Sequence, residues 1–94
     1  DQGKELYGFQ SYYPSGEVKV HGCLNQKMKR IGVWRSYYQD GTPWSIGTYD
    51  TSGIETGLKR VWYANGQIRY QGQMQNGKPI GEWEYFEENG KKKE

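Results

Sequence analysis

Residues 57–75, GLKRVWYANGQIRYQGQMQ, carry the clearest structural signal in this chain. Its centre is Asn65-Gly66, a dipeptide that favours tight β-turns because glycine adopts positive φ angles at little steric cost. The flanks, 57–63 and 67–75, are rich in Tyr, Trp, Ile and Val, which are typical of strands. No long window of the chain shows the 3.6-residue period of a helix. The stretch therefore predicts a β-hairpin.

The hairpin pattern recurs along the chain. Copies start at Tyr7, Gly32, Gly57 and Gly81, which are 25, 25 and 24 residues apart. Two columns run through all four copies, an aromatic residue (Tyr12, Tyr37, Trp62, Phe86) and a turn glycine (Gly16, Gly41, Gly66, Gly90). Two more run through the three complete copies, a strand glycine (Gly22, Gly47, Gly72) and a large apolar residue (Leu24, Tyr49, Met74). Such periodicity indicates a repeat architecture.

The repeat sets the expected organisation and fold class. We expect a lead-in over residues 1–6 and a single repeat domain over residues 7–94. The copies span 7–31, 32–56, 57–80 and, in part, 81–94. Polar linkers at 25–31, 50–56 and 76–80 are expected to turn the chain at the opposite edge of the sheet. The predicted fold is all-β, an elongated antiparallel β-hairpin meander of seven to eight strands.

Two hairpin registers are compatible with the turn sequences. A two-residue turn pairs Tyr63 with Ile68 and places Trp34 across from Gly47. A type I turn with a bulge at the glycine, which suits residues 14–16, shifts the pairing by one residue. We favour the two-residue turn, because a large ring across from a strand glycine fills the space that the absent side chain leaves.

Composition limits the function classes. Thirteen Lys and Arg residues nearly balance 11 Asp and Glu residues, for a net charge of +2, which argues against a dedicated nucleic-acid binder. The hydrophobic content is only 33%, but four Trp, nine Tyr and two Phe residues supply apolar surface, and we expect most of them to form the core. A single Cys excludes an internal disulfide and a Cys-based zinc cage.

We expect a soluble protein, since no apolar run is long enough for a transmembrane segment. The chain starts at Asp1 rather than Met, so we expect a processed or excised product. Export with a signal removed ahead of Asp1 is compatible with the sequence, and the compartment stays open.

Residues 81–90, GEWEYFEENG, resemble the bacterial variant of the MORN repeat, whose pattern runs roughly Gly-x-Trp-x-x-Tyr-x-x-Asn-Gly. Residues 32–41, GVWRSYYQDG, match almost as well, whereas the third copy has Lys59 in place of Trp and the first has Tyr7 in place of Gly. The resemblance implies an elongated sheet of successive hairpins without catalytic residues. Many bacterial members are labelled antitoxin components of toxin–antitoxin systems, and eukaryotic relatives are linked to contacts with membrane lipids and proteins.

A row of aromatic residues is the first candidate binding site. Its predicted members are Tyr12, Tyr37, Trp44 and Trp62. Rows of Tyr and Trp are common at protein interfaces because they bury large areas at low entropic cost. They also suit stacking on carbohydrate, and the sequence does not separate a peptide from a sugar.

A basic patch is the second candidate site. Lys27, Lys29, Arg30 and Arg35 surround the first turn between hairpins. Such a cluster suits the headgroups of anionic lipids. Solvated surface is the plainer interpretation, and the small net charge favours it.

Candidate chemistry is sparse. His21 and Cys23 lie two positions apart on one strand, and a metal site needs three or four ligands, so we interpret them as a half-exposed strand pair. The carboxylates between Glu82 and Glu88 would be the site of a hydrolase, but a charge-paired sheet edge with residues 91–93 is the favoured interpretation. We therefore predict no enzyme activity, no metal and no cofactor.

The predicted function is a non-enzymatic module for protein–protein interaction. Binding to anionic membrane lipid and an antitoxin role are the alternatives. The edge formed by Leu6, Tyr7, Phe9, Tyr12 and Tyr13 is unusually apolar, so we expect another protein, a second copy of the chain or residues ahead of Asp1 to pair with it.

Overall fold

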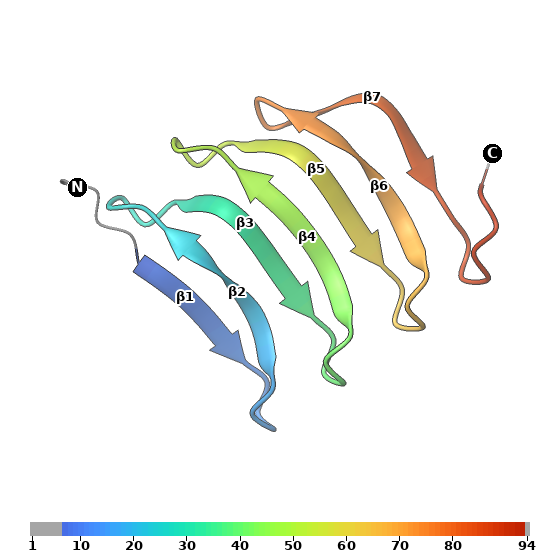
Figure 1. Cartoon of the computed structure of the whole chain (residues 1–94), viewed down its shortest axis with the longest axis horizontal. Coiled ribbons are helices and arrows are strands. Elements are labelled where there is room, and N and C mark those ends of the chain that lie inside the picture. The colour runs from blue at the N-terminus through green and yellow to red at the C-terminus, as the bar shows by residue number, and fades with distance from the viewer. Residues whose placement is uncertain (1–6, 94) are drawn as a thin grey trace.

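A computed structural model describes residues 7–93 and shows seven strands in one sheet (Figure 1). The strands are β1 (Tyr7–Tyr12), β2 (Val18–Leu24), β3 (Arg30–Tyr37), β4 (Pro43–Tyr49), β5 (Glu55–Trp62), β6 (Ile68–Gln75) and β7 (Lys78–Tyr85). They follow one another across the sheet in chain order, and each neighbouring pair is antiparallel. The predicted all-β meander is therefore confirmed. The predicted lead-in, with Leu6, lies outside the described residues, as does Glu94.

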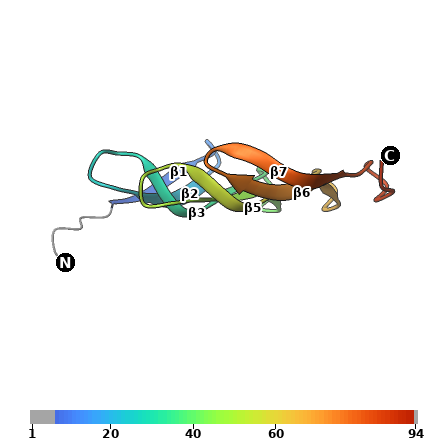
Figure 2. The same cartoon turned by 90° about the horizontal axis from the view of Figure 1, so that it is seen from above.

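The sheet has a single layer. Its extents are 47 × 38 × 15 Å, and the edge-on view shows a thin, twisted ribbon (Figure 2). Among the described residues, only Trp34, Ser36, Val61 and Met74 are buried. The expectation that most aromatic residues form the core is wrong, because a single sheet has no second layer against which both of its faces could pack.

Strand alternation and register define two faces. The indole face carries Trp34 and Trp83, and the four buried side chains also lie on it, as the pairs Ser36–Ser45 and Ser45–Val61 show. The row face is the other side of the sheet and carries Tyr12, Tyr37, Trp62 and Phe86. Successive side chains of a strand point to opposite faces, and each of these residues is an odd number of positions from an indole-face residue of its own copy. The predicted columns therefore occupy equivalent places, with the Leu24 column on the indole face and the Tyr12 column on the row face.

The prediction of a two-residue turn at Asn65-Gly66 is wrong. The Tyr63 N–H donates to the Gln67 carbonyl at 2.8 Å, and the Gly66 N–H donates back to the Tyr63 carbonyl at 3.0 Å. This is a three-residue loop with Gly66 at φ 92°, the bulged alternative. The Asn65 side chain accepts a hydrogen bond from the Gln67 N–H at 2.9 Å, which stabilises the loop. Equivalent backbone bonds form at Gly16, Gly41 and Gly90.

The body of each hairpin nevertheless has the predicted register. Trp62 pairs with Ile68 next to the loop, but the following pair is Val61 with Tyr70, so Arg69 is an extra residue. This second bulge cancels the shift that the loop introduces. As a result, Trp34 lies across from Gly47 as expected. The same extra position holds Lys19 in β2 and Trp44 in β4.

The two-residue Asn-Gly turn does occur, at the other edge of the sheet. Gln75 pairs with Lys78, and the two residues between them, Asn76 and Gly77, have φ angles of 53° and 79°. The earlier linkers use three-residue loops instead, closed by backbone bonds between Asn25 and Lys29 and between Asp50 and Ile54. The shorter loop explains why the third copy is one residue shorter than the first two.

Candidate functional site

An apolar row crosses the row face at one end of the strands. Tyr12 pairs with Val18, Tyr37 with Pro43 and Trp62 with Ile68, and Phe86 pairs with Lys92 beyond the last strand. We define the apolar row as Tyr12, Val18, Tyr37, Pro43, Trp62, Ile68 and Phe86. Aromatic and aliphatic residues alternate along it. The row therefore brings together three of the four aromatic residues predicted as a binding site.

Trp44 does not join this row. As the extra residue of β4 it lies beside Tyr38, with ring centroids 6.1 Å apart, and it lines a hollow together with Trp34 and Gly47 on the indole face. The bulge that places Trp44 there depends on hydrogen bonding across the hairpin, so the residue pattern alone did not reveal it.

A column of tyrosines tethers successive repeats and was missed by the sequence analysis. The hydroxyls of Tyr13, Tyr38 and Tyr63 donate 2.7 Å hydrogen bonds to the backbone carbonyls of Tyr37, Trp62 and Phe86. Each acceptor is the row residue of the next copy, so the tethers hold the backbone of the row in place. The signal was present in the sequence as a Tyr directly after the row residue in three copies.

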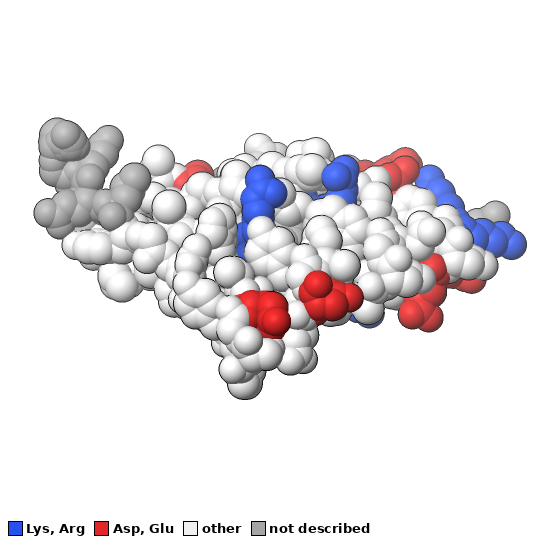
Figure 3. Space-filling view, turned by 60° about the horizontal axis from the view of Figure 1, so that its bottom comes forward, with Lys and Arg blue, Asp and Glu red and all other residues white. Residues whose placement is uncertain are grey.

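The predicted basic patch is divided between the two faces. Lys27 and Lys29 lie in the loop between β2 and β3, and the guanidinium of Arg30 lies over the Trp34 ring at 4.4 Å on the indole face. Arg35 pairs with His21 and Ile46 on the row face. In the space-filling view, Lys and Arg side chains are interspersed with Asp and Glu side chains, and they adjoin one another only toward the C-terminal end of the sheet (Figure 3). Alternation along β3 separates Arg30 from Arg35.

One residue of the predicted acidic cluster, Glu84, belongs to a polar ladder on the row face. Arg60 donates to the Gln71 side chain at 2.6 Å, and Gln71 donates to Oε1 of Glu84 at 2.7 Å. Lys92 lies 3.6 Å from Oε2 of Glu84. The hydrogen bond from Gln71 lowers the pKa of Glu84 below its ordinary value, and the Lys92 charge lowers it further. Both oxygens of Glu84 are thus bound within the ladder.

His21 and Cys23 are both exposed on β2. Within residues 7–93, no three His, Cys, Asp or Glu side chains are grouped so that they could hold a metal ion. Over the same residues, no helix has the length and apolar character needed to cross a membrane.

On the indole face, tryptophan rings cover strand glycines of the preceding hairpin. A Cβ at Gly22 would overlap the ring of Trp34, and a Cβ at Gly72 would overlap the ring of Trp83. The Trp34 indole N–H donates to the carbonyls of Cys23 and Ile31 at 3.0 and 3.2 Å. The expectation that a ring of the same hairpin fills the space above each glycine is therefore wrong, although the predicted pairing is right.

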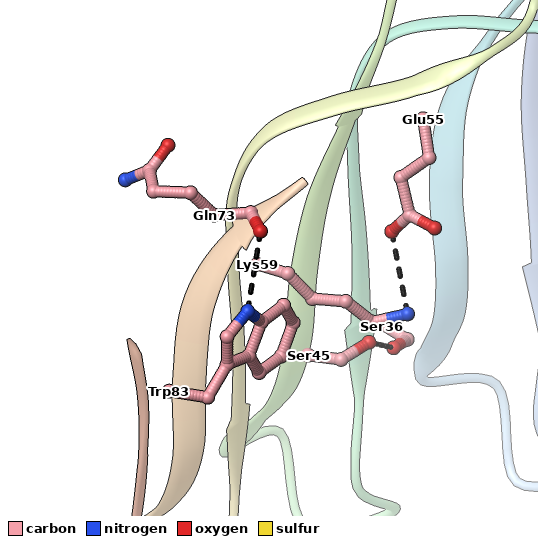
Figure 4. A network of polar contacts seen from close by, with 6 residues as sticks. All are labelled: Ser36, Ser45, Glu55, Lys59, Gln73 and Trp83. Atoms are coloured by element: carbon pink, nitrogen blue, oxygen red, sulfur yellow. Dashed lines mark hydrogen bonds and ion pairs between the residues drawn. The ribbon is translucent and has the colours of Figure 1, made fainter. Parts of the chain in front are cut away.

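Lys59 breaks this series in the third copy. Its ammonium group lies 3.3 Å from Oε2 of Glu55, and that oxygen is the nearest atom above Gly47, 3.3 Å from where a Cβ would be (Figure 4). The hydroxyls of Ser36 and Ser45 are hydrogen-bonded to each other next to it. A hollow of about 270 Å³ opens at this place.

Comparison with known protein families identified the repeat. The MORN repeat variant family matches residues 30–51, 55–76 and 79–94, together well over half of the chain. Neither the curated proteins nor the solved structures gave a significant match. The first copy is outside the matched ranges, consistent with Tyr7 in place of the initial Gly.

Proposed function

Because the chain belongs to the MORN repeat variant family, we propose that it is a non-enzymatic module that binds another protein through the apolar row. The family relation by itself supports only a general role in contacts with proteins or membranes. The arrangement of the row favours a protein partner.

The observation that carries this proposal is the exposed apolar surface of the row face. Tyr12 is 55% exposed, Pro43 is also exposed, and the other five members of the apolar row are half-buried, so none of the seven is covered. Monomeric proteins rarely leave large contiguous apolar surface uncovered unless it binds something. Aromatic residues in such a surface are typical of the central part of protein interfaces.

The tyrosine tethers make the row suitable for binding. The hydroxyls of Tyr13, Tyr38 and Tyr63 hold backbone carbonyls of the row in place before any partner arrives. A surface that is ordered in advance loses less conformational entropy when it binds, so more of the contact energy contributes to affinity. The alternation of rings with Val, Pro and Ile also gives the row a mixed aromatic and aliphatic surface, which suits side chains of a protein.

Binding to anionic lipid has less support. A membrane-facing cluster needs its cations on one side, whereas Arg30 and Arg35 lie on opposite faces of the sheet. Of the four basic residues in the predicted patch, only Lys27 and Lys29 lie in the same loop.

The proposal is tested by identifying a protein that the chain captures and measuring its affinity as a purified protein. Tyr12→Glu places a charge in the row, and Tyr85→Glu places the same charge at an exposed position on the indole face. We expect Tyr12→Glu to abolish binding and Tyr85→Glu to retain it. Equal binding by both variants would contradict the row as the interface.

A vesicle experiment separates the lipid alternative. The wild-type chain and a Lys27→Gln/Lys29→Gln variant are floated with vesicles that contain or lack phosphatidylserine. We expect no flotation with either vesicle. Flotation that requires phosphatidylserine and disappears in the variant or at high salt would favour lipid binding instead.

A further inference from the structure

The indole face has three equivalent strand glycines, and one of them lacks its ring. Trp34 covers Gly22 and Trp83 covers Gly72. Each indole N–H is directed at one backbone carbonyl of the preceding strand and one of its own strand. The equivalent residue above Gly47 is Lys59, which does not cover the glycine in the same way. The site above Gly47 therefore has the backbone arrangement of a tryptophan-binding site but lacks the tryptophan.

The hollow above Gly47 has an aromatic and polar lining. Trp34, Trp44 and Tyr49 line it, together with Ser36 and Ser45, whose hydroxyls are hydrogen-bonded to each other. Its volume of about 270 Å³ exceeds the roughly 150 Å³ that suffices for a benzene ring. It is smaller than most pockets for drug-sized molecules, which begin at about 300 Å³. The size therefore suits one large side chain.

The charge at the mouth of the hollow is positive and not fully neutralised. Within residues 7–93, the ion pairs are Lys59 with Glu55 and Lys92 with Glu84, so the guanidinium of Arg30 has no carboxylate partner there. Instead it lies over the rings of Trp34 and Tyr49, at 4.4 and 6.0 Å from their centroids. This placement leaves its N–H groups available to an incoming carboxylate.

We propose that the hollow above Gly47 receives a tryptophan side chain of a partner protein, with an acidic residue next to that tryptophan in its sequence binding Arg30. This goes beyond the proposed function, because it concerns the opposite face of the sheet and specifies the chemistry of the ligand. The occupant is a tryptophan because the chain itself shows, twice, which ring fits above this glycine column.

The polar contacts of such a ring follow from the two filled sites. Trp83 donates its indole N–H to the carbonyls of Gln73 and Ile80 at 3.2 and 3.1 Å. At the site above Gly47, the carbonyls equivalent to those of Gln73 and Ile80 belong to Thr48 and Thr56. The pair of Lys59 and Glu55 must move aside, which is inexpensive because partly exposed ion pairs contribute little to stability.

The test uses the dipeptide acetyl-Trp-Glu-amide as a probe, titrated into the ¹⁵N-labelled full chain and followed by the amide resonances. We expect saturable shifts centred on Gly47 and Ser45. Acetyl-Trp-Gln-amide should bind about two- to fivefold more weakly, since it lacks the charge that pairs with Arg30. Acetyl-Ala-Glu-amide should produce no saturable shift.

A variant that closes the hollow gives the sharpest control. Lys59→Trp supplies the missing ring and should abolish probe binding while the chain stays folded. Leu58→Trp adds the same ring one residue earlier, on the row face, and should leave probe binding unchanged. If Lys59→Trp alone fails to fold, the double variant Glu55→Arg/Lys59→Trp is used in its place, because it reproduces the arrangement of Arg30 over Trp34.

Three results would overturn the inference. They are unchanged probe binding in the folded Lys59→Trp variant, shifts centred on the apolar row instead of Gly47, and binding of free indole-3-acetate at least as tight as that of the dipeptide. The last result would assign the hollow to a small aromatic acid. The experiment with Tyr12→Glu is independent of all three, so failure here leaves the proposed function standing.

Discussion

The hydroxyl of Tyr38 donates a 2.7 Å hydrogen bond to the backbone carbonyl of Trp62, 24 residues further along the chain. Tyr13 and Tyr63 make the same bond to the following copy. In a sheet without a second layer, apolar burial is limited, so such bonds between hairpins are expected to carry an unusually large share of the stability.

Removal of one tether should destabilise the sheet. Tyr38→Phe deletes the donor and leaves the Trp62 carbonyl without that bond in a partly buried place, at a cost of about 1–2 kcal/mol in the free energy of unfolding. Tyr12→Phe is the matched control, because within residues 7–93 the Tyr12 hydroxyl donates only to the exposed side chain of Gln10. Urea unfolding of both variants measures the difference, and equal costs would argue against a special role for the tether.

Glycines of one column should respond differently to the same substitution. In Gly72→Ala the new methyl group overlaps the ring of Trp83, so we expect a loss of about 1–3 kcal/mol from overpacking. In Gly47→Ala the methyl group meets only the end of the Glu55 side chain at 3.3 Å, which can move. Thermal unfolding should therefore show a much larger decrease in Tm for Gly72→Ala. A similar decrease for both would contradict the difference between the filled and open sites.

Backbone conformation alone should distinguish two other glycines. A Cβ at Gly66 or at Gly8 would have no neighbour within 4 Å, but Gly66 has a φ angle of 92° whereas Gly8 lies in extended strand β1. Gly66→Ala should lower the free energy of unfolding by about 1 kcal/mol or more, and Gly8→Ala should leave it unchanged or raise it slightly. Denaturant titration of the pair tests the bulged turn directly.

Met28 should be a site for stabilisation. It has a φ angle of 63° at the loop position that Gly53 occupies in the next copy, and its side chain is 62% exposed. Because a long side chain in the left-handed region is strained, Met28→Gly should raise the free energy of unfolding by up to about 1 kcal/mol. A lower Tm for Met28→Gly would show that the exposed side chain contributes more than the strain costs.

The ladder at Glu84 should make stability depend on pH. The pKa of Glu84 is lowered in the folded chain, first by the hydrogen bond from Gln71 and then by Lys92. Its contribution is therefore present above the ordinary Glu pKa of about 4.3 and is lost as the pH falls through the lower, folded-state pKa. Urea unfolding across this range should show a shallower acid loss for Glu84→Gln than for the wild type. Gln71→Leu should also reduce the loss, and an undiminished loss in both variants would refute the assignment.

The residue pattern predicted the hairpin repeat and the register in the body of each hairpin, but not the type of turn. Columns such as Gly16, Gly41 and Gly66 recur at the repeat period, and alternation along a strand assigns each residue to a face. These are local properties, because one turn and its two flanking strands decide them. The prediction that Trp34 lies across from Gly47 is accordingly confirmed.

The turn types and the relations between hairpins depend on the tertiary structure. The chain contains Asn-Gly at 65–66, 76–77 and 89–90, yet only the pair at 76–77 forms a two-residue turn. In the hairpin of β5 and β6, the bulge at Arg69 absorbs the extra residue of the loop at 64–66. The ring above Gly22 comes from the next hairpin, and Arg30 and Arg35 diverge to opposite faces. Bulges and loop lengths shift one hairpin against the next, and their effect depends on hydrogen bonds between strands that the residue pattern of a single repeat does not contain.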